Sequence, residues 1–219
     1  MELIEQNSTG KLWWFKNSLV NANTFIFSLN SDPETLFVVD PGSESKETYS
    51  NNRLLFDVKF IILLTHGHFD HVIGVNEFNG RSTSVFLHPF EEKHLIRNNF
   101  YMKALKLPFE APDFEWKSTE ELKEINSSIS VLECPGHTEG SVMYQVGDWL
   151  FTGDSVLSKS LIAPTVRGND SQRQLESVKS IFLEISRQTM ILPGHGKPMR
   201  LNEMLKVNLE LFDLIEKGR

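Results

Sequence analysis

The sequence predicts an α/β protein with a four-layer αββα sandwich, in which two β-sheets pack together and helices lie outside them. Two observations favour this fold class. Segments rich in β-branched and aromatic residues precede segments with helical spacing, and this order occurs in both halves of the chain. No low-complexity segment, sequence repeat or obvious interdomain linker interrupts the 219 residues. We therefore expect a single domain that spans residues 1–219.

The first half of the chain is expected to alternate strands with short helices. Residues 18–29 and 35–40 predict two antiparallel strands, because the polar stretch 31–34 between them favours a turn. The aromatic, mixed-charge stretch 90–116 predicts a helical excursion followed by a loop. The other expected elements are a surface helix at 46–56, a buried strand at 59–64, a helix at 71–78 and a strand at 84–87.

The second half begins with strands and ends with helices. A hairpin is expected around Gly147 and Asp148, because these residues favour a tight turn between two apolar runs. The last element is an amphipathic helix at 201–216, which places Asn208 on the same face as its apolar residues. The remaining expected elements are strands at 128–133, 141–146, 149–152 and 189–192 and a helix at 171–186.

Composition and charge restrict the classes of partner. With 40% hydrophobic and 23% charged residues, the chain has the composition of a globular protein that buries a substantial core. A net charge of −7 disfavours nucleic acid and anionic lipid as partners. Cys134 is the only cysteine, and no apolar run approaches the length of a membrane span or signal segment. We therefore expect a cytoplasmic protein; no sequence feature predicts its oligomeric state.

The most informative segment is the short run from Thr65 to His71. It contains His66, His68, Asp70 and His71, directly after an apolar strand and before the start of a helix. Side chains at such a turn project from the carboxyl end of the strand, where α/β folds place their chemistry. Neutral imidazole and carboxylate groups are the ligands that Zn²⁺ and iron prefer, so the run predicts a metal site.

Three further candidate ligands lie in glycine-containing turns after apolar strands: His137, Asp154 and His195. Seven ligands exceed the four that one tetrahedral Zn²⁺ accepts, so two metal ions are expected. His66 and His68 can converge on one ion while Asp70 and His71 serve the other. A carboxylate has two oxygens, so Asp154 could bridge both ions, which leaves His137 and His195 to complete one site each. His88 and His94 occupy no such turn and are not expected to be ligands.

The combined pattern of H-x-H-x-D-H with P-G-H-T, T-G-D and P-G-H-G turns resembles the metallo-β-lactamase-fold hydrolases. It is most similar to the glyoxalase II (hydroxyacylglutathione hydrolase) type, over residues 18–200. The resemblance implies an αββα sandwich with two ions, in which Asp154 is shared. It assigns His66, His68 and His137 to the first ion and Asp70, His71 and His195 to the second. Asp40 matches a family aspartate that orients ligands, although its Asp-Pro-Gly context is equally typical of a plain turn.

The chain departs from the family in the segment after Asp154. Two arginines of the short glyoxalase II-like proteins correspond to Ser158 and Ala163 here. Lys159 and Arg167 lie close by in the sequence and are the candidate substrate contacts.

The expected reaction is hydrolysis of a small acyl substrate. Two divalent ions sharing a water would lower its pKa and supply a bridging hydroxide nucleophile. Asp70 is the candidate to orient the hydroxide and to accept a proton. A thiolate leaves without needing a strong general acid, so a thioester is the expected substrate. The expected metal is zinc, and iron or manganese also fits. Alternatives are lactone hydrolysis, persulfide dioxygenation at one iron held by His66, His137 and Asp154, and a non-enzymatic metal-binding role.

Overall fold

A computed structural model describes residues 1–44, 58–78, 83–104, 106, 113–161 and 170–217. The chain divides into two compact units, Met1–Thr119 and Glu120–Arg219. Each unit is built around one of the two expected sheets, and a single domain containing both stays a prediction. The helix expected at 46–56 and the candidate substrate contact Arg167 lie outside the described residues.

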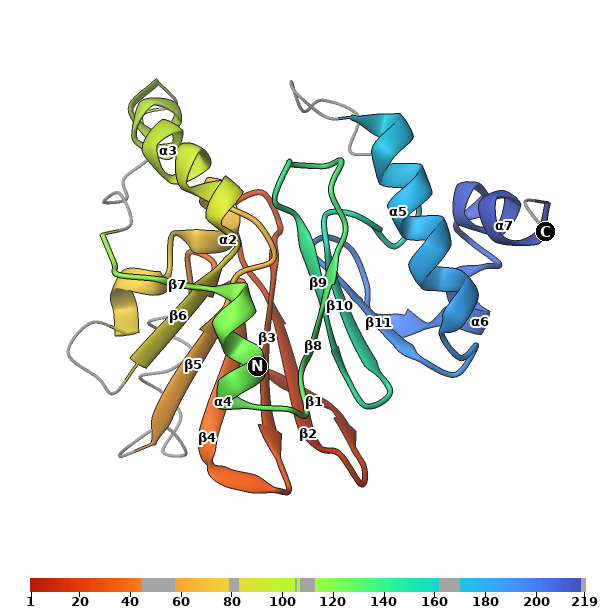
Figure 1. Cartoon of the computed structure of the whole chain (residues 1–219), viewed down its shortest axis with the longest axis horizontal. Helices are drawn as coiled ribbons and strands as arrows, with labels where there is room; N and C mark the ends of the chain where they lie inside the picture. Colours follow the sequence, from red (N-terminus) through yellow and green to blue (C-terminus); the bar gives the residue numbers. More distant parts are fainter. Residues whose placement is uncertain (45–57, 79–82, 105, 107–112, 162–169, 218–219) are drawn as a thin grey trace. The chain divides into compact units, whose positions relative to one another are not determined.

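Within its described residues, the first unit contains a sheet whose strands follow one another in sequence order (Figure 1). The first four strands are antiparallel, and β4 to β7 run parallel to one another. These strands are β1 (Glu2–Gln6), β2 (Gly10–Lys16), β3 (Asn23–Leu29), β4 (Asp32–Val39), β5 (Lys59–Leu63), β6 (Thr83–Leu87) and β7 (Lys117–Ser118).

The expected strands of this sheet are present, but two boundaries were wrong. The strand expected from residue 18 begins at Asn23, because Val20 and Asn21 have φ values of 47° and 60° and form a turn instead. The next strand begins at Asp32, since the turn is confined to the two residues before it. Pro33 therefore lies at the start of a strand, a position that a residue without an N–H group tolerates.

Helices of the first unit pack on one face of its sheet. These helices are α2 (Phe69–Val72), η2 (Val75–Phe78), η3 (Pro89–Glu91) and α3 (Glu92–Ala104). Val72, Val75 and Phe78 belong to one buried cluster with strand residues such as Val38 and Ile62. The helix expected at 71–78 is divided at Gly74, whose N–H donates to the carbonyl oxygen of Pro41 rather than continuing the helix. The helical excursion expected after residue 90 is present as α3.

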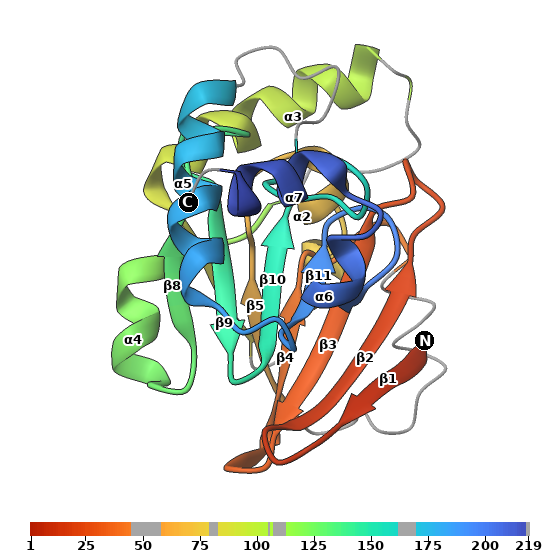
Figure 2. The ribbon, with the colours of Figure 1, turned by 90° about the vertical axis from the view of Figure 1, so that its right-hand side faces the viewer.

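The second unit contains a five-stranded sheet within its described residues, in the order β12-β11-β10-β9-β8. Only β10 and β11 are parallel. Three helices lie on one face of this sheet (Figure 2), where Val178, Leu201 and Leu211 join Leu150 and Ile191 in one buried cluster. The elements are η4 (Thr119–Glu121), α4 (Leu122–Ile125), β8 (Ser130–Glu133), β9 (Val142–Val146), β10 (Trp149–Gly153), α5 (Ser171–Glu184), β11 (Met190–Pro193), β12 (Met199–Arg200), α6 (Leu201–Met204) and α7 (Leu209–Glu216). No helix in the described part of the chain is long and apolar enough to cross a membrane.

The expected strands of the second unit and the helix at 171–186 are confirmed to within two residues. The single final helix was wrong, because the chain breaks between α6 and α7. Asn208 causes the break. Its side-chain oxygen accepts from the N–H of Leu211 at 3.0 Å and caps α7, while its amide donates to the carbonyl oxygen of Leu157 at 3.0 Å. In the sequence, this polar residue on the apolar face of the expected helix was the signal for the break.

Replacing Asn208 with Ala should lower the free energy of unfolding by about 1–3 kcal/mol, because it removes a helix cap and a buried hydrogen bond. Urea unfolding followed by circular dichroism measures the change. Asn202→Ala, at an exposed position of α6, is the matched control and should change stability little. Equal stability of the two variants would contradict the capping role.

Candidate metal centre

The carboxyl ends of β4 and β5 bring Asp40 beside the ligand run. The two strands are parallel, with Val39 opposite Leu63, so the residues that follow each strand lie at the same edge. Asp40 has a φ of 50°, and its carboxylate accepts from the backbone N–H of Thr65 at 2.8 Å. Its other oxygen lies 2.7 Å from the Thr65 hydroxyl and 3.0 Å from Nδ1 of His71. Asp40 therefore contacts both ends of the run.

These hydrogen bonds determine which ring nitrogen of two histidines carries the proton. A carboxylate only accepts, so Nδ1 of His71 must donate to Asp40, which places the lone pair on Nε2. The Thr65 hydroxyl gives its proton to Asp40 and so accepts from Nδ1 of His66, 3.1 Å away. Both His66 and His71 thus present a basic Nε2, which is the form that binds a metal.

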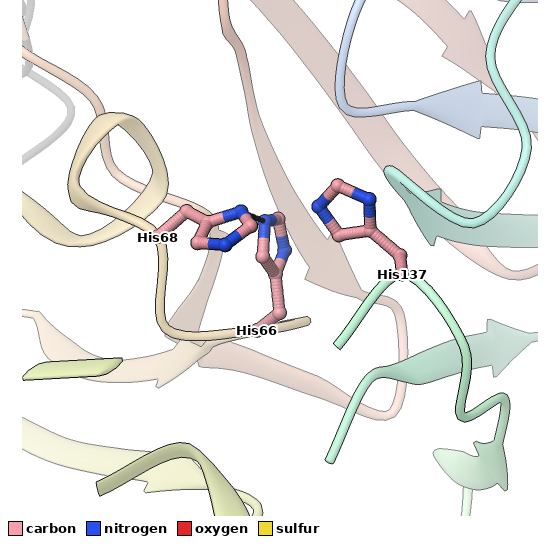
Figure 3. Close-up of side chains that lie close together, drawn as sticks. All are labelled: His66, His68 and His137. Carbon is pink, nitrogen blue, oxygen red and sulfur yellow. Dashed lines mark hydrogen bonds between the residues drawn. The ribbon is translucent and has the colours of Figure 1, made fainter. Parts of the chain in front are cut away.

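The candidate ligands of the first unit form two pairs. Nε2 of His66 lies 3.0 Å from Nδ1 of His68, and Figure 3 shows the two rings turned toward each other. Nε2 of His71 lies 3.5 Å from a carboxylate oxygen of Asp70. The donor atoms of each pair are close enough to share one ion. The rings of His66 and His71 also lie 4.2 Å apart, so the division of the ligands between two ions stays a prediction.

Asp154 lies between the two candidate histidines of the second unit. One of its oxygens is 3.7 Å from Nε2 of His137 and 3.5 Å from Nε2 of His195. The parallel pairing of β10 and β11 explains this arrangement for His195, because Gly153 lies opposite Pro193 and the N–H of Gly194 donates to the Gly153 carbonyl oxygen. The same carboxylate oxygen therefore faces both candidate histidines. His137 is the third residue labelled in Figure 3.

Two buried polar side chains to which the sequence assigned no role hold these turns. The Gln174 amide donates to the carbonyl oxygen of Ser155, next to Asp154, and a Cβ on Gly136, next to His137, would lie 2.3 Å from the Cβ of Gln174. The Ser158 hydroxyl donates to the carbonyl oxygen of Lys197 at 2.9 Å. Ser158 is 5% exposed and packs beneath the His195 turn. Neither role has a local sequence signal, since both depend on tertiary contacts.

The other candidate residues lie as follows. Lys159 is exposed, directly after the buried Ser158. His88 caps η3 by accepting from the N–H of Phe90. The ring of His94 on α3 lies 5.3 Å from that of His68, in an edge-to-face contact.

Cys134 immediately follows β8, near the His137 turn, and it is fully buried. Burial raises the pKa of its thiol to about 12, although a hydrogen bond with Ser155 acts in the opposite direction. Metal binding and nucleophilic attack both require a thiolate. Cys134 is therefore a packing residue.

The native protein should react with a thiol reagent at pH 8 about 1,000-fold more slowly than the unfolded chain, since each pKa unit is a factor of ten in thiolate. The comparison of rates with and without urea measures this directly. Comparable rates in the two states would show that the thiol is accessible and ionised.

The donor set fits a divalent transition metal. The seven candidate ligands offer five imidazoles and two carboxylates, which suit zinc, iron and manganese. Within each unit the donor atoms converge without help from the other unit.

Comparison with known proteins supports this assignment. A protein from Bacillus velezensis named "probable polyketide biosynthesis zinc-dependent hydrolase" is 27% identical over 194 residues, covering 84% of this chain and 79% of that protein. A hydroxyacylglutathione hydrolase from Buchnera aphidicola is 24% identical over 194 residues, covering 88% and 68%. The crystal structure of TTHA1623 in a di-iron-bound form matches with a TM-score of 0.77 and 25% identity, over 90% of this chain and 98% of that one.

These matches confirm the predicted fold class. The family model of the metallo-beta-lactamase superfamily matches residues 19–195, which include all seven candidate ligands. By its fold and this match, the chain belongs to the metallo-β-lactamase superfamily.

Proposed function

We propose that this protein is a metal-dependent hydrolase that cleaves a small thioester with two bound zinc ions. The observation that carries the proposal is the position of Asp154, with one carboxylate oxygen within 3.7 Å of Nε2 of His137 and 3.5 Å of Nε2 of His195. A carboxylate placed between the His137 set and the His195 set would serve two neighbouring ions. The relatives named as a zinc-dependent hydrolase and a hydroxyacylglutathione hydrolase support the choice of metal and of bond.

The proposed ligands fall into two sets that share Asp154. Bound divalent ions would lower the pKa of a water and polarise a substrate carbonyl oxygen. The first set is His66, His68, His137 and Asp154, and the second is Asp70, His71, His195 and Asp154.

Asp70 and Asp40 have different roles in this proposal. The Asp70 carboxylate is 9% exposed and would orient the attacking water and accept its proton. Asp40 is 2% exposed and would not meet substrate. It keeps Nε2 of His66 and His71 unprotonated through the hydrogen bonds described above.

A thioester is the proposed substrate because its leaving group is a stable thiolate, so the reaction needs no strong general acid. Ser158 carries no charge and donates to backbone carbonyl oxygens, so any cationic recognition of the thiol part would have to come from other residues. Lys159 and Arg167 are the proposed contacts. The proposed thiol part is therefore not restricted to glutathione, and assays with a panel of thioesters test which thiol the protein accepts.

The decisive experiment combines metal analysis with substrate assays. Protein purified in air and under anaerobic conditions is analysed for metal identity and stoichiometry, and then assayed with thioesters of glutathione and coenzyme A, a lactone and a persulfide. Two zinc equivalents with thioester turnover support the proposal. Lactone turnover alone, or one iron equivalent with oxygen consumption on the persulfide, would overturn it. Metal-loaded protein that turns over none of these substrates indicates a metal-binding module instead.

A further inference from the structure

The peptide groups on both sides of Gly67 are held by side chains from outside the ligand run. The N–H of Gly67 donates to a carboxylate oxygen of Glu91 at 2.8 Å. The carbonyl oxygen of Gly67 accepts from the Asn98 amide at 2.8 Å. Gly67 separates His66 from His68, so these two hydrogen bonds fix one peptide group on each side of it. The orientation of the two imidazoles relative to each other depends on both peptide groups.

The residues that hold Gly67 lie on one face of a continuous helical segment. Glu91 ends η3 and Asn98 lies in α3, with His94 between them, and the spacing of three and four residues places all three on the same side. Glu91 is fully buried and Asn98 is 2% exposed. The ring of His94 lies edge-to-face with that of His68 at 5.3 Å. The helical segment therefore contacts Gly67 and His68 through three side chains, those of Glu91, His94 and Asn98.

Packing explains the glycine between the two histidines. A Cβ at position 67 would lie 3.0 Å from the Glu91 carbonyl oxygen and 3.0 Å from the Cβ of His94. These distances are tighter than ordinary van der Waals contact, and one of the neighbours is backbone. Gly67 thus permits the close approach of the helix that brings Glu91 and Asn98 within hydrogen-bonding distance.

We propose that Glu91 and Asn98 are positioning residues for the metal centre, which set the geometry of the His66–His68 pair by clamping the two peptide groups of Gly67. This inference rests on metal binding in the proposed function but not on the choice of substrate. Loss of either hydrogen bond lets one peptide group rotate and moves the donor nitrogens of His66 and His68, which lie 3.0 Å apart. Replacing a residue that holds a metal ligand in place typically weakens metal binding by about 10- to 100-fold.

The test compares variants of the same helix by metal affinity and by the visible spectrum of the Co²⁺-substituted protein. Asn98→Ala removes the amide that holds the Gly67 carbonyl oxygen, and we expect about 10- to 100-fold weaker Zn²⁺ binding by chelator competition, with altered Co²⁺ absorption bands. Leu95→Ala is the control for lost packing, because Leu95 packs against the apolar core and its side chain cannot form a hydrogen bond with Gly67. Arg97→Ala, at an exposed position, is the control for the helix surface.

A conservative change at Glu91 provides a second and independent readout. Glu91→Gln keeps an acceptor oxygen for the Gly67 N–H and should retain most of the affinity and the wild-type Co²⁺ spectrum, whereas Glu91→Ala should lose both. The positioning role of Glu91 and Asn98 is refuted if Leu95→Ala and Asn98→Ala weaken Zn²⁺ binding equally, or if Glu91→Ala keeps the wild-type Co²⁺ spectrum. Wild-type protein that binds metal but cleaves no thioester would refute the proposed function and leave the positioning role intact. Metal affinity and the Co²⁺ spectrum are measured without turnover.

Discussion

Asp154→Ala is expected to remove both metal ions from the protein together. The physical reason is that one Asp154 oxygen lies 3.7 Å from Nε2 of His137 and 3.5 Å from Nε2 of His195, so its loss removes an anionic ligand from each set. Hydrolysis of the best thioester should fall by at least about 1,000-fold, equivalent to roughly 4 kcal/mol of lost transition-state stabilisation. Elemental analysis after gel filtration measures the metal content, and the assay measures the rate.

The control for this prediction is Asp148→Ala. Asp148 lies at the exposed hairpin turn between β9 and β10, so the change has the same chemistry on the same sheet without approaching a ligand. It should leave metal content and rate unchanged. Retention of both ions by Asp154→Ala would exclude a shared carboxylate, and loss of only one ion would make Asp154 a ligand of that ion alone.

The sequence identifies the candidate ligands because their signals are local. His66 and His68 precede α2, and Asp70 and His71 lie in it, so all four fall within six consecutive residues. Each remaining candidate follows an apolar strand and a glycine, which identifies a turn at a strand end without knowledge of the fold. The strands before Asp154 and His195, β10 and β11, are short apolar runs that are easily recognised, whereas β8 before His137 has only two apolar residues.

Residues that hold the turns could not be predicted, because their roles come from contacts that are distant in sequence. Glu91 and Asn98 lie 24 and 31 residues from Gly67, and Gln174 lies 19 residues from Ser155. In the sequence they are ordinary polar residues of helical segments. The strands β1 and β2 were not predicted for a related reason. The first has only exposed or half-buried residues, so its place at the sheet edge depends on pairing with β2 rather than on an apolar pattern.

The local sequence allows two roles for Asp40, as a residue that orients ligands or as a plain turn residue, and the structure distinguishes between them. Its φ of 50° agrees with a turn, and an aspartate adopts that conformation more readily than most residues. A turn alone, however, does not require the carboxylate to be 2% exposed and within hydrogen-bonding distance of Thr65 and His71. The side chain therefore holds Thr65 and the candidate ligand His71 in addition to the role of the backbone in the turn.

Asp40→Asn should weaken Zn²⁺ binding by about 10- to 100-fold and lower the free energy of unfolding by about 1–3 kcal/mol. Asparagine tolerates the same backbone conformation, so the change tests the carboxylate and not the turn. The two oxygens of Asp40 accept from the N–H and hydroxyl of Thr65 and from Nδ1 of His71. An amide has one oxygen, so its NH₂ group must face a donor on one side.

The amide has two orientations, and each has a distinct cost. If the NH₂ group faces His71, that ring must accept at Nδ1 and carry its proton on Nε2, and this tautomer cannot bind a metal through Nε2. If the NH₂ group faces the N–H of Thr65, two buried donors oppose each other and the folded state loses stability. Asp32→Asn, near the start of the same strand and only half-buried, should change neither quantity. Chelator competition gives the affinity and urea unfolding of the metal-free protein gives the stability. Wild-type values of both for Asp40→Asn would reduce Asp40 to a turn residue.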